Sequence, residues 1–186
     1  YAYWLLWLVL STTSAAEEVA LQKGLFWQID RAGLTPSYLF ATLHSEDPRI
    51  LQLPLIVQTH FEQAKSAAIE VVMDIPSIQQ FSNAMFFSGT PHLDQLLDKA
   101  IFSKIIEALR QYGITEKLAR NMKPWAVMTT LRQPPSHTGQ YLEMKLYQRA
   151  MELQIPLYGL EKVAEQLQIF ADMPLAEQVV LLTDTV

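Results

Sequence analysis

The chain has 186 residues, of which 50% are hydrophobic and 18% are charged, so it is long and apolar enough for one domain with a real core. Its net charge is −5 and it has no run of lysine and arginine, which argues against nucleic acid or an anionic membrane surface as a partner. The absence of cysteine excludes disulfides, a thiolate nucleophile and a cysteine-based zinc site in this sequence.

The first segment of the chain has the order of parts found in a secretion signal. Residues 1–10 are apolar and uncharged, residues 11–16 are small, and two glutamates follow. We predict a partial signal peptide at 1–16 that is cut after Ala15 or Ala16, with a secreted or periplasmic product that has no stable membrane span after cleavage. The alternative is an amphipathic or buried N-terminal helix.

The next segment alternates between strand and helix patterns. Residues 25–30 and 38–44 are predicted strands joined by a turn at 31–36, which indicates a hairpin. A helix at 55–65 and a strand at 67–74 follow. Because strand, helix and strand alternate here, we predict a right-handed crossover within one sheet.

The centre of the chain is predicted to be mainly helical. Thr90 and Pro91 suit the start of a helix at 93–112, which Gly113 would end. The further predicted elements are helices at 115–121, 125–131, 141–153, 161–170 and 175–183, a loop at 133–139 and a strand at 155–160. The whole pattern indicates an α/β (α+β) fold: a central mixed sheet, an N-terminal hairpin and a large helical segment.

Two residues are the main candidates for chemistry. His44 ends an apolar strand pattern and is followed by acids, and Glu70 is a lone carboxylate within the apolar run 67–73. Strand ends commonly carry functional side chains, and imidazole with carboxylate suits a divalent metal or an acid–base pair. The alternative is that each only satisfies a hydrogen bond or stays in solvent.

Other polar residues near His44 have structural interpretations. Glu46 and Asp47 fit a solvated turn, with Asp47 bonding backbone before Pro48 and pairing with Arg49. Trp125, just inside a predicted helix, fits a core anchor. The sequence contains no Walker loop, GxGxxG, HExxH or GxSxG, so nucleotide sites and common hydrolase signatures have no support.

Several segments, in this order, resemble the TraB/GumN family, which includes the TIKI-type metalloproteases. They are the segment 24–29, Ala41-Thr42-Leu43-His44 at the place of a Gly-x-x-His motif, the segments 47–50 and 53–54, the acid-bearing strand 68–74, Met122-Lys123-Pro124-Trp125, and the stretches 139–143 and 155–167. The resemblance extends over residues 24–182. Ala41 stands where the family has glycine, and would be strained if that position needed a positive φ. Glu143 stands where the family tends to have aspartate.

The resemblance implies a metal-dependent hydrolase or peptidase of the cell envelope. It implies His44 and Glu70 as catalytic and metal-binding residues, with Glu161 as a lesser candidate, and a divalent ion whose identity, manganese or zinc, stays open. The partner would be a peptide or another small envelope substrate. The family has a second Gly-x-x-His motif in a C-terminal half, so we expect the domain at 24–186 to be truncated at its C-terminal end.

Two other classes of function stay open on the sequence alone. One is a non-catalytic envelope protein that binds a peptide or regulates surface polysaccharide through the same pocket. The other is a structural domain in which His44 and Glu70 bond only each other. Metal binding and turnover by the full-length protein would distinguish the three.

Overall fold

A computed structural model describes residues 24–186, and the predicted signal peptide at 1–16 lies outside this range. The chain divides into two compact units, with the division between Leu39 and Phe40. Both candidate residues, His44 and Glu70, belong to the second unit. Among the described residues, no helix has the length and hydropathy that a membrane crossing requires.

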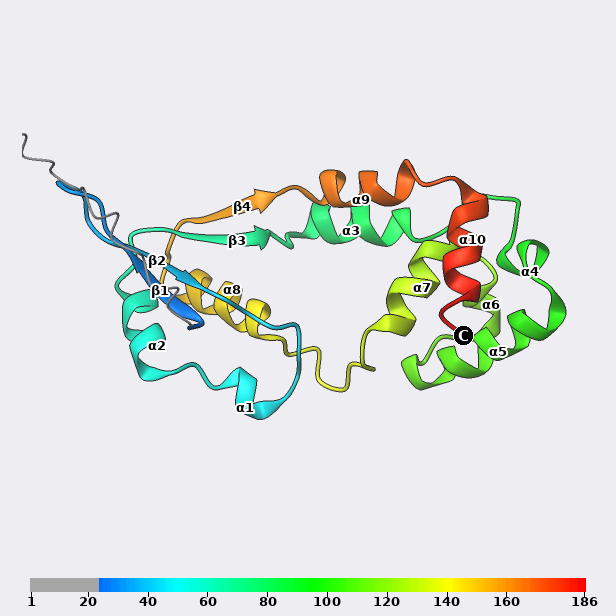
Figure 1. Cartoon of the computed structure of the whole chain (residues 1–186), viewed down its shortest axis with the longest axis horizontal. Coiled ribbons are helices and arrows are strands. Elements are labelled where there is room, and N and C mark those ends of the chain that lie inside the picture. Colours follow the sequence, from blue (N-terminus) through cyan, green and yellow to red (C-terminus); the bar gives the residue numbers. More distant parts are fainter. Residues whose placement is uncertain (1–23) are drawn as a thin grey trace, which may run out of the picture. The chain divides into compact units, whose positions relative to one another are not determined.

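Within the described range, the strands form two small sheets (Figure 1). They are β1 (Phe26–Ile29), β2 (Ser37–Phe40), β3 (Ala67–Val71) and β4 (Leu157–Glu161). Strand β1 pairs with β2, and the link between them is too short for a parallel crossover, so the predicted hairpin is confirmed. Strand β3 pairs in parallel with β4, with Ala67 opposite Leu157 and Val71 opposite Glu161. The predicted α/β class is confirmed as well.

The strand pairing corrects three parts of the sequence prediction. Strand β2 ends at Phe40 and does not continue to residue 44, and its partner among the described residues is the equally short β1. The parallel partner of β3 is β4, so the predicted crossover from β2 to β3 in one sheet is wrong. Two sheets of two strands therefore stand in place of one central mixed sheet. The physical reason is that β3 pairs with a strand far along the chain, which no local pattern reveals.

Helices make up most of the second unit. In chain order they are α1 (Pro48–Leu51), α2 (Leu55–Glu62), α3 (Ile75–Ala84), α4 (Leu93–Leu96), α5 (Lys99–Leu109), the 3₁₀ helix η1 (Arg110–Tyr112), α6 (Glu116–Ala119), α7 (Pro124–Arg132), α8 (Leu142–Glu152), α9 (Val163–Ala171) and α10 (Leu175–Thr183). The predicted helix at 175–183 is confirmed, and those at 115–121, 125–131 and 141–153 are confirmed to within a few residues.

Aspartate caps explain the largest differences between predicted and observed helices. The carboxylate of Asp98 accepts hydrogen bonds from the backbone N–H groups of Ala100 (2.8 Å) and Ile101 (2.9 Å), so α5 begins there and the predicted single helix at 93–112 is divided. Asp47 caps α1 and Asp74 caps α3, two helices that the sequence did not predict. Gly113, with φ 70°, ends η1 as predicted.

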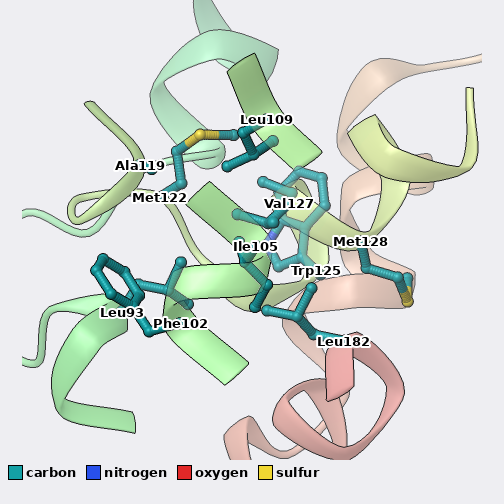
Figure 2. Close-up of a cluster of buried hydrophobic side chains, with 11 residues drawn as sticks. Leu93, Phe102, Ile105, Leu109, Ala119, Met122, Trp125, Val127, Met128 and Leu182 are labelled. Carbon is teal, nitrogen blue, oxygen red and sulfur yellow. The ribbon is translucent and has the colours of Figure 1, made fainter. Parts of the chain in front are cut away.

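The hydrophobic core lies within the helical part of the second unit. Its buried members come from α4 to α7 and from α10, and Figure 2 shows them around Trp125. Trp125 is 3% exposed, its ring stacks on Phe170 at 4.4 Å between centroids, and it meets Phe81 edge-on at 6.1 Å. The prediction that Trp125 is a core anchor is therefore confirmed.

Helix α8 is fixed to the segment that follows His44. The Lys145 Nζ donates a hydrogen bond to the carbonyl oxygen of Leu51 at 3.2 Å. The Arg149 guanidinium donates to the Glu62 carboxylate on α2, with Nη2 and Oε1 2.6 Å apart. These contacts hold α8 against residues 51–62, which follow the loop that carries His44.

Candidate functional site

His44 lies in the loop between β2 and α1, beyond the strand end where the sequence placed it. Its ring stacks on Tyr141, the N-cap residue of α8, with centroids 3.7 Å apart and planes inclined by 15°. Its Nδ1 lies 3.9 Å from Oε2 of Glu143 in the first turn of α8. The His44 side chain is 54% exposed, so one face is held by Tyr141 while the imidazole remains accessible to a ligand.

Glu143 points a buried carboxylate oxygen at this histidine. Its Oε2 has almost no contact with solvent and no hydrogen-bond partner among the described residues. A separation of 3.9 Å from Nδ1 is longer than a hydrogen bond but close enough for electrostatic attraction to an imidazolium. Glu143 is therefore placed to orient the His44 ring, a role that the sequence did not predict.

Glu70 lies on β3 and is exposed to solvent. Its Oε1 accepts a hydrogen bond from Nε2 of Gln166 on α9 at 2.7 Å. The same amide nitrogen donates to Oε2 of Glu161 at 3.1 Å, so Gln166 brings the two carboxylates into one cluster. Glu161 closes β4 and does not begin a helix, which corrects the predicted helix start at that residue.

The structure gives His44 and Glu70 separate sets of contacts. His44 is held by the start of α8, whereas Glu70 is bonded to α9. Within residues 24–186, no group of three or more histidine, aspartate or glutamate side chains is arranged to hold a metal ion. Binding of one ion by both His44 and Glu70 therefore stays a prediction.

A hollow of about 430 Å³ lies beside His44. It is lined by residues 45–47 on one side and by Pro134, Pro135, His137, Thr138 and Tyr141 on the other. Tyr141 both lines this hollow and stacks on His44, so the histidine is adjacent to it. A larger hollow of about 700 Å³ is lined by parts of α5, η1 and α7 and by residues 185–186, and none of the predicted site residues line it.

Glu46 has an unexpected set of partners, far from it in sequence. Its carboxylate accepts hydrogen bonds from the Ser136 hydroxyl (2.6 Å) and from the backbone N–H groups of His137 (2.8 Å), Thr138 (3.1 Å) and Gly139 (2.7 Å). These donors, the Ser136 hydroxyl first and the His137 amide next, hold the pKa of Glu46 at about 2, and its partial burial opposes them. The solvated turn predicted for Glu46 is therefore wrong, since the side chain binds a second segment.

Asp47 and Arg49 behave as the sequence predicted. The Asp47 carboxylate accepts from the Arg49 backbone N–H at 2.8 Å and from the Arg49 guanidinium, with Nη2 and Oδ2 2.5 Å apart. The Arg49 side chain, and then its backbone N–H, lower the pKa of Asp47 to about 2. The Asp47 carboxylate and the Arg49 guanidinium therefore bond each other at the start of α1, and Asp47 also lines the hollow.

The alanine at the position of the motif glycine is not strained. Among the described non-glycine residues, the one with a positive φ is Gln154, so Ala41 has a backbone conformation that alanine adopts readily. The departure from the Gly-x-x-His pattern therefore leaves the local geometry of the His44 loop intact.

The comparison with known protein families decides the relationship that these residues suggest. Residues 25–186 match the TraB/PrgY/gumN family. The chain belongs to this family. The resemblance predicted from the order of the motifs is thus confirmed over nearly the whole chain. No curated protein and no solved structure gives a significant match.

Proposed function

We propose that this member of the TraB/PrgY/gumN family is an exported, metal-dependent hydrolase that acts on peptide bonds. The observation that carries the proposal is the placement of His44, the motif histidine. Its ring is held by Tyr141, faced by the Glu143 carboxylate and still half exposed next to a hollow of about 430 Å³. An accessible imidazole beside a hollow is an arrangement in which the side chain can reach a bound ligand.

The donor chemistry of the candidate residues fits a divalent ion, manganese or zinc. His44 offers an imidazole nitrogen and Glu70 a carboxylate oxygen, which are ligand types that both metals accept. Both side chains are exposed, and the hydrogen bond that Gln166 donates to Glu70 uses only Oε1. Such an ion, when bound, activates water or polarises a carbonyl oxygen.

The protein's own contribution is to orient the histidine and to receive the substrate. Stacking on Tyr141 restricts rotation of the His44 ring, and Nδ1 faces the Glu143 carboxylate, which leaves Nε2 as the other ring nitrogen for a ligand. Two prolines and Tyr141 give the hollow an apolar wall, and Ser45, His137 and Thr138 give it polar groups. A mixed lining of this kind suits a peptide segment.

The test is metal content and turnover of the full-length protein. We expect the purified protein to bind a divalent ion, to hydrolyse members of a peptide library, to lose this activity on treatment with a chelator and to regain it with manganese or zinc. Absence of both metal binding and turnover at saturating metal would contradict the proposal. Peptide or polysaccharide binding without turnover would then identify a non-catalytic envelope protein.

Export is a separate part of the proposal with its own measurement. We expect the mature protein to begin after Ala15 or Ala16, because an apolar run precedes small residues and then acids. Mass spectrometry of the protein from an envelope or secreted fraction measures the N-terminus directly. An intact segment 1–16 on protein found in the cytosol would show that the segment is not a signal peptide.

A further inference from the structure

Two segments that are far apart in sequence are joined side by side at the hollow. The first segment is 44–46 and the second is 136–143. Glu46 binds residues 136–139, whereas His44, two residues earlier in the chain, contacts the later residues Tyr141 and Glu143. The two segments therefore run in opposite directions and are joined at both ends of a short contact. Glu46 makes the polar end of this contact, and the His44–Tyr141 stack makes the aromatic end.

The 136–139 loop depends on Glu46 for its attachment. Ser136, His137, Thr138 and Gly139 are all exposed, and within residues 24–186 each hydrogen bond that joins them to another part of the chain ends on the Glu46 carboxylate. The remaining bonds are internal, as from the Gly139 N–H to Ser136 Oγ at 3.1 Å. With no buried side chain to fix it, the loop is held in place by one carboxylate.

Only a carboxylate matches this set of donors. Four donors, one hydroxyl and three backbone N–H groups, converge on the two oxygens of Glu46, which accept and do not donate. A glutamine side chain has the same shape, but its NH₂ group would face the N–H donors and lose the bonds on that side. The same bonds occupy both oxygens, so Glu46 is not available as a metal ligand or as a base.

We propose that Glu46 is a positioning residue: it fixes the 136–139 loop against the His44 segment and thereby sets both the wall of the hollow and the His44–Tyr141 stack. Residues 136–139 are joined to Tyr141 through Gln140, so their release removes the support of the Tyr141 ring on its N-terminal side, while α8 itself stays held by Lys145 and Arg149. His137 and Thr138, which line the hollow, move with the loop. The consequence for catalysis rests on the proposed function, whereas the consequence for the loop and the ring does not.

Asp47→Asn is the matched control for Glu46→Gln. Asp47 is the residue after Glu46, and its replacement by asparagine removes the same negative charge. Its pKa is also about 2, but its side chain bonds Arg49 of α1 and not the 136–139 loop. A general effect of charge or of the α1 segment would appear in both variants. An effect of the loop attachment would appear in Glu46→Gln alone. Glu46→Asp keeps the carboxylate on a shorter stem and should recover part of the wild-type behaviour.

The first measurement is amide hydrogen exchange by NMR in the full-length protein. In Glu46→Gln we expect exchange at His137, Thr138 and Gly139 to become at least about tenfold faster, because each loses its acceptor or has it weakened. Exchange at these amides in Asp47→Asn should stay within about twofold of wild type, and core amides of α5 should be unchanged in both variants. Unchanged exchange at residues 137–139 in Glu46→Gln would overturn the proposal.

The second measurement tests whether the loop positions His44. In wild type the Tyr141 ring shields the imidazole, so the His44 ring protons should resonate upfield, and Glu46→Gln should shift them towards the values of an unstacked histidine. Glu46→Asp should lie between the two. Faster loop exchange with unchanged His44 signals would overturn the positioning role. If Glu46→Gln fails to fold, the comparison of Glu46→Asp with Asp47→Asn tests whether Glu46 positions the His44 ring.

The third measurement links the contact to turnover. If the proposed function holds, Glu46→Gln should lower kcat/KM by about tenfold or more, and Glu46→Asp should restore part of it. The control for turnover is Glu116→Gln, because the Glu116 carboxylate accepts from Arg120 Nη2 at 2.6 Å and does not line the hollow, and this variant should stay close to wild type. Equal losses in Glu46→Gln and Glu116→Gln would overturn the role in catalysis. An inactive wild-type protein would refute the proposed function alone, because the exchange and ring-shift measurements need no turnover.

Discussion

Replacement of Trp125 by alanine is expected to destabilise the protein by about 3–5 kcal/mol, which is a large fraction of the stability of an ordinary domain. Trp125 is 3% exposed and stacks on Phe170 of α9 while its edge meets Phe81 of α3. The substitution leaves a cavity where α7 joins these two helices, and it removes two aromatic contacts in addition to the buried area. Nearby backbone can relax only in part, so the cavity persists.

Thermal and urea unfolding measure this effect. A loss of this size should lower the melting temperature by about 6–20 °C in a chain of this length. Met151→Ala is the matched control, because Met151 is 59% exposed on α8, and it should change stability by less than about 0.5 kcal/mol. A loss of less than about 1 kcal/mol in Trp125→Ala would mean that the core is not organised around this residue.

Local sequence signals predicted two of the helix starts well. Thr115 accepts a hydrogen bond from the Leu118 N–H, and Pro124 stands in the first turn of α7, so both starts could be read from the chain. The Asp98 cap was missed because apolar spacing continues across it from α4 into α5. The apolar periodicity predicted which face of each helix is buried, but the boundary between α4 and α5 depends on the Asp98 cap.

The strand pairing could not be predicted in the same way. Strand β3 and strand β4 each have a recognisable apolar pattern, but the choice of β4 as the parallel partner of β3 depends on helices that lie between them in sequence. The nearer strand β2 was the expected partner and is paired with β1. Local propensity identifies a strand, whereas tertiary packing selects its partner.

For the candidate site, too, local patterns predicted individual residues but not their partners. His44 and Glu70 were identified because each stands out within an apolar run. Tyr141 and Glu143 were missed as partners of His44, since nothing in the residues near His44 points to α8. For Glu46 the only local signal was a carboxylate close to the motif histidine. Its donors are backbone N–H groups, which any sequence provides, so the pairing became visible only in the folded chain.

Replacement of either His44 or Glu70 is expected to reduce turnover far more than it reduces stability. If both bind the ion, His44→Ala and Glu70→Gln should each lower metal content and reduce kcat/KM by at least about 100-fold, since even partners outside the ligand shell commonly contribute 10–100-fold. Stability should fall by no more than about 1.5 kcal/mol, because both side chains are exposed and the main loss is the stack on Tyr141.

Two control variants separate metal binding from simpler explanations. Gln166→Leu removes the hydrogen bond to Glu70 and keeps the carboxylate. If the role of Glu70 is only to hold α9 through this bond, Gln166→Leu should reproduce the loss seen in Glu70→Gln; if Glu70 binds the ion, Gln166→Leu should retain most of the metal and activity. His60→Ala on α2 serves as the histidine control and should leave metal content unchanged. Wild-type metal content and turnover in both His44→Ala and Glu70→Gln would exclude both residues as ligands. A loss of metal and turnover in His44→Ala alone would place the metal site at the contact of His44 with α8 and exclude Glu70.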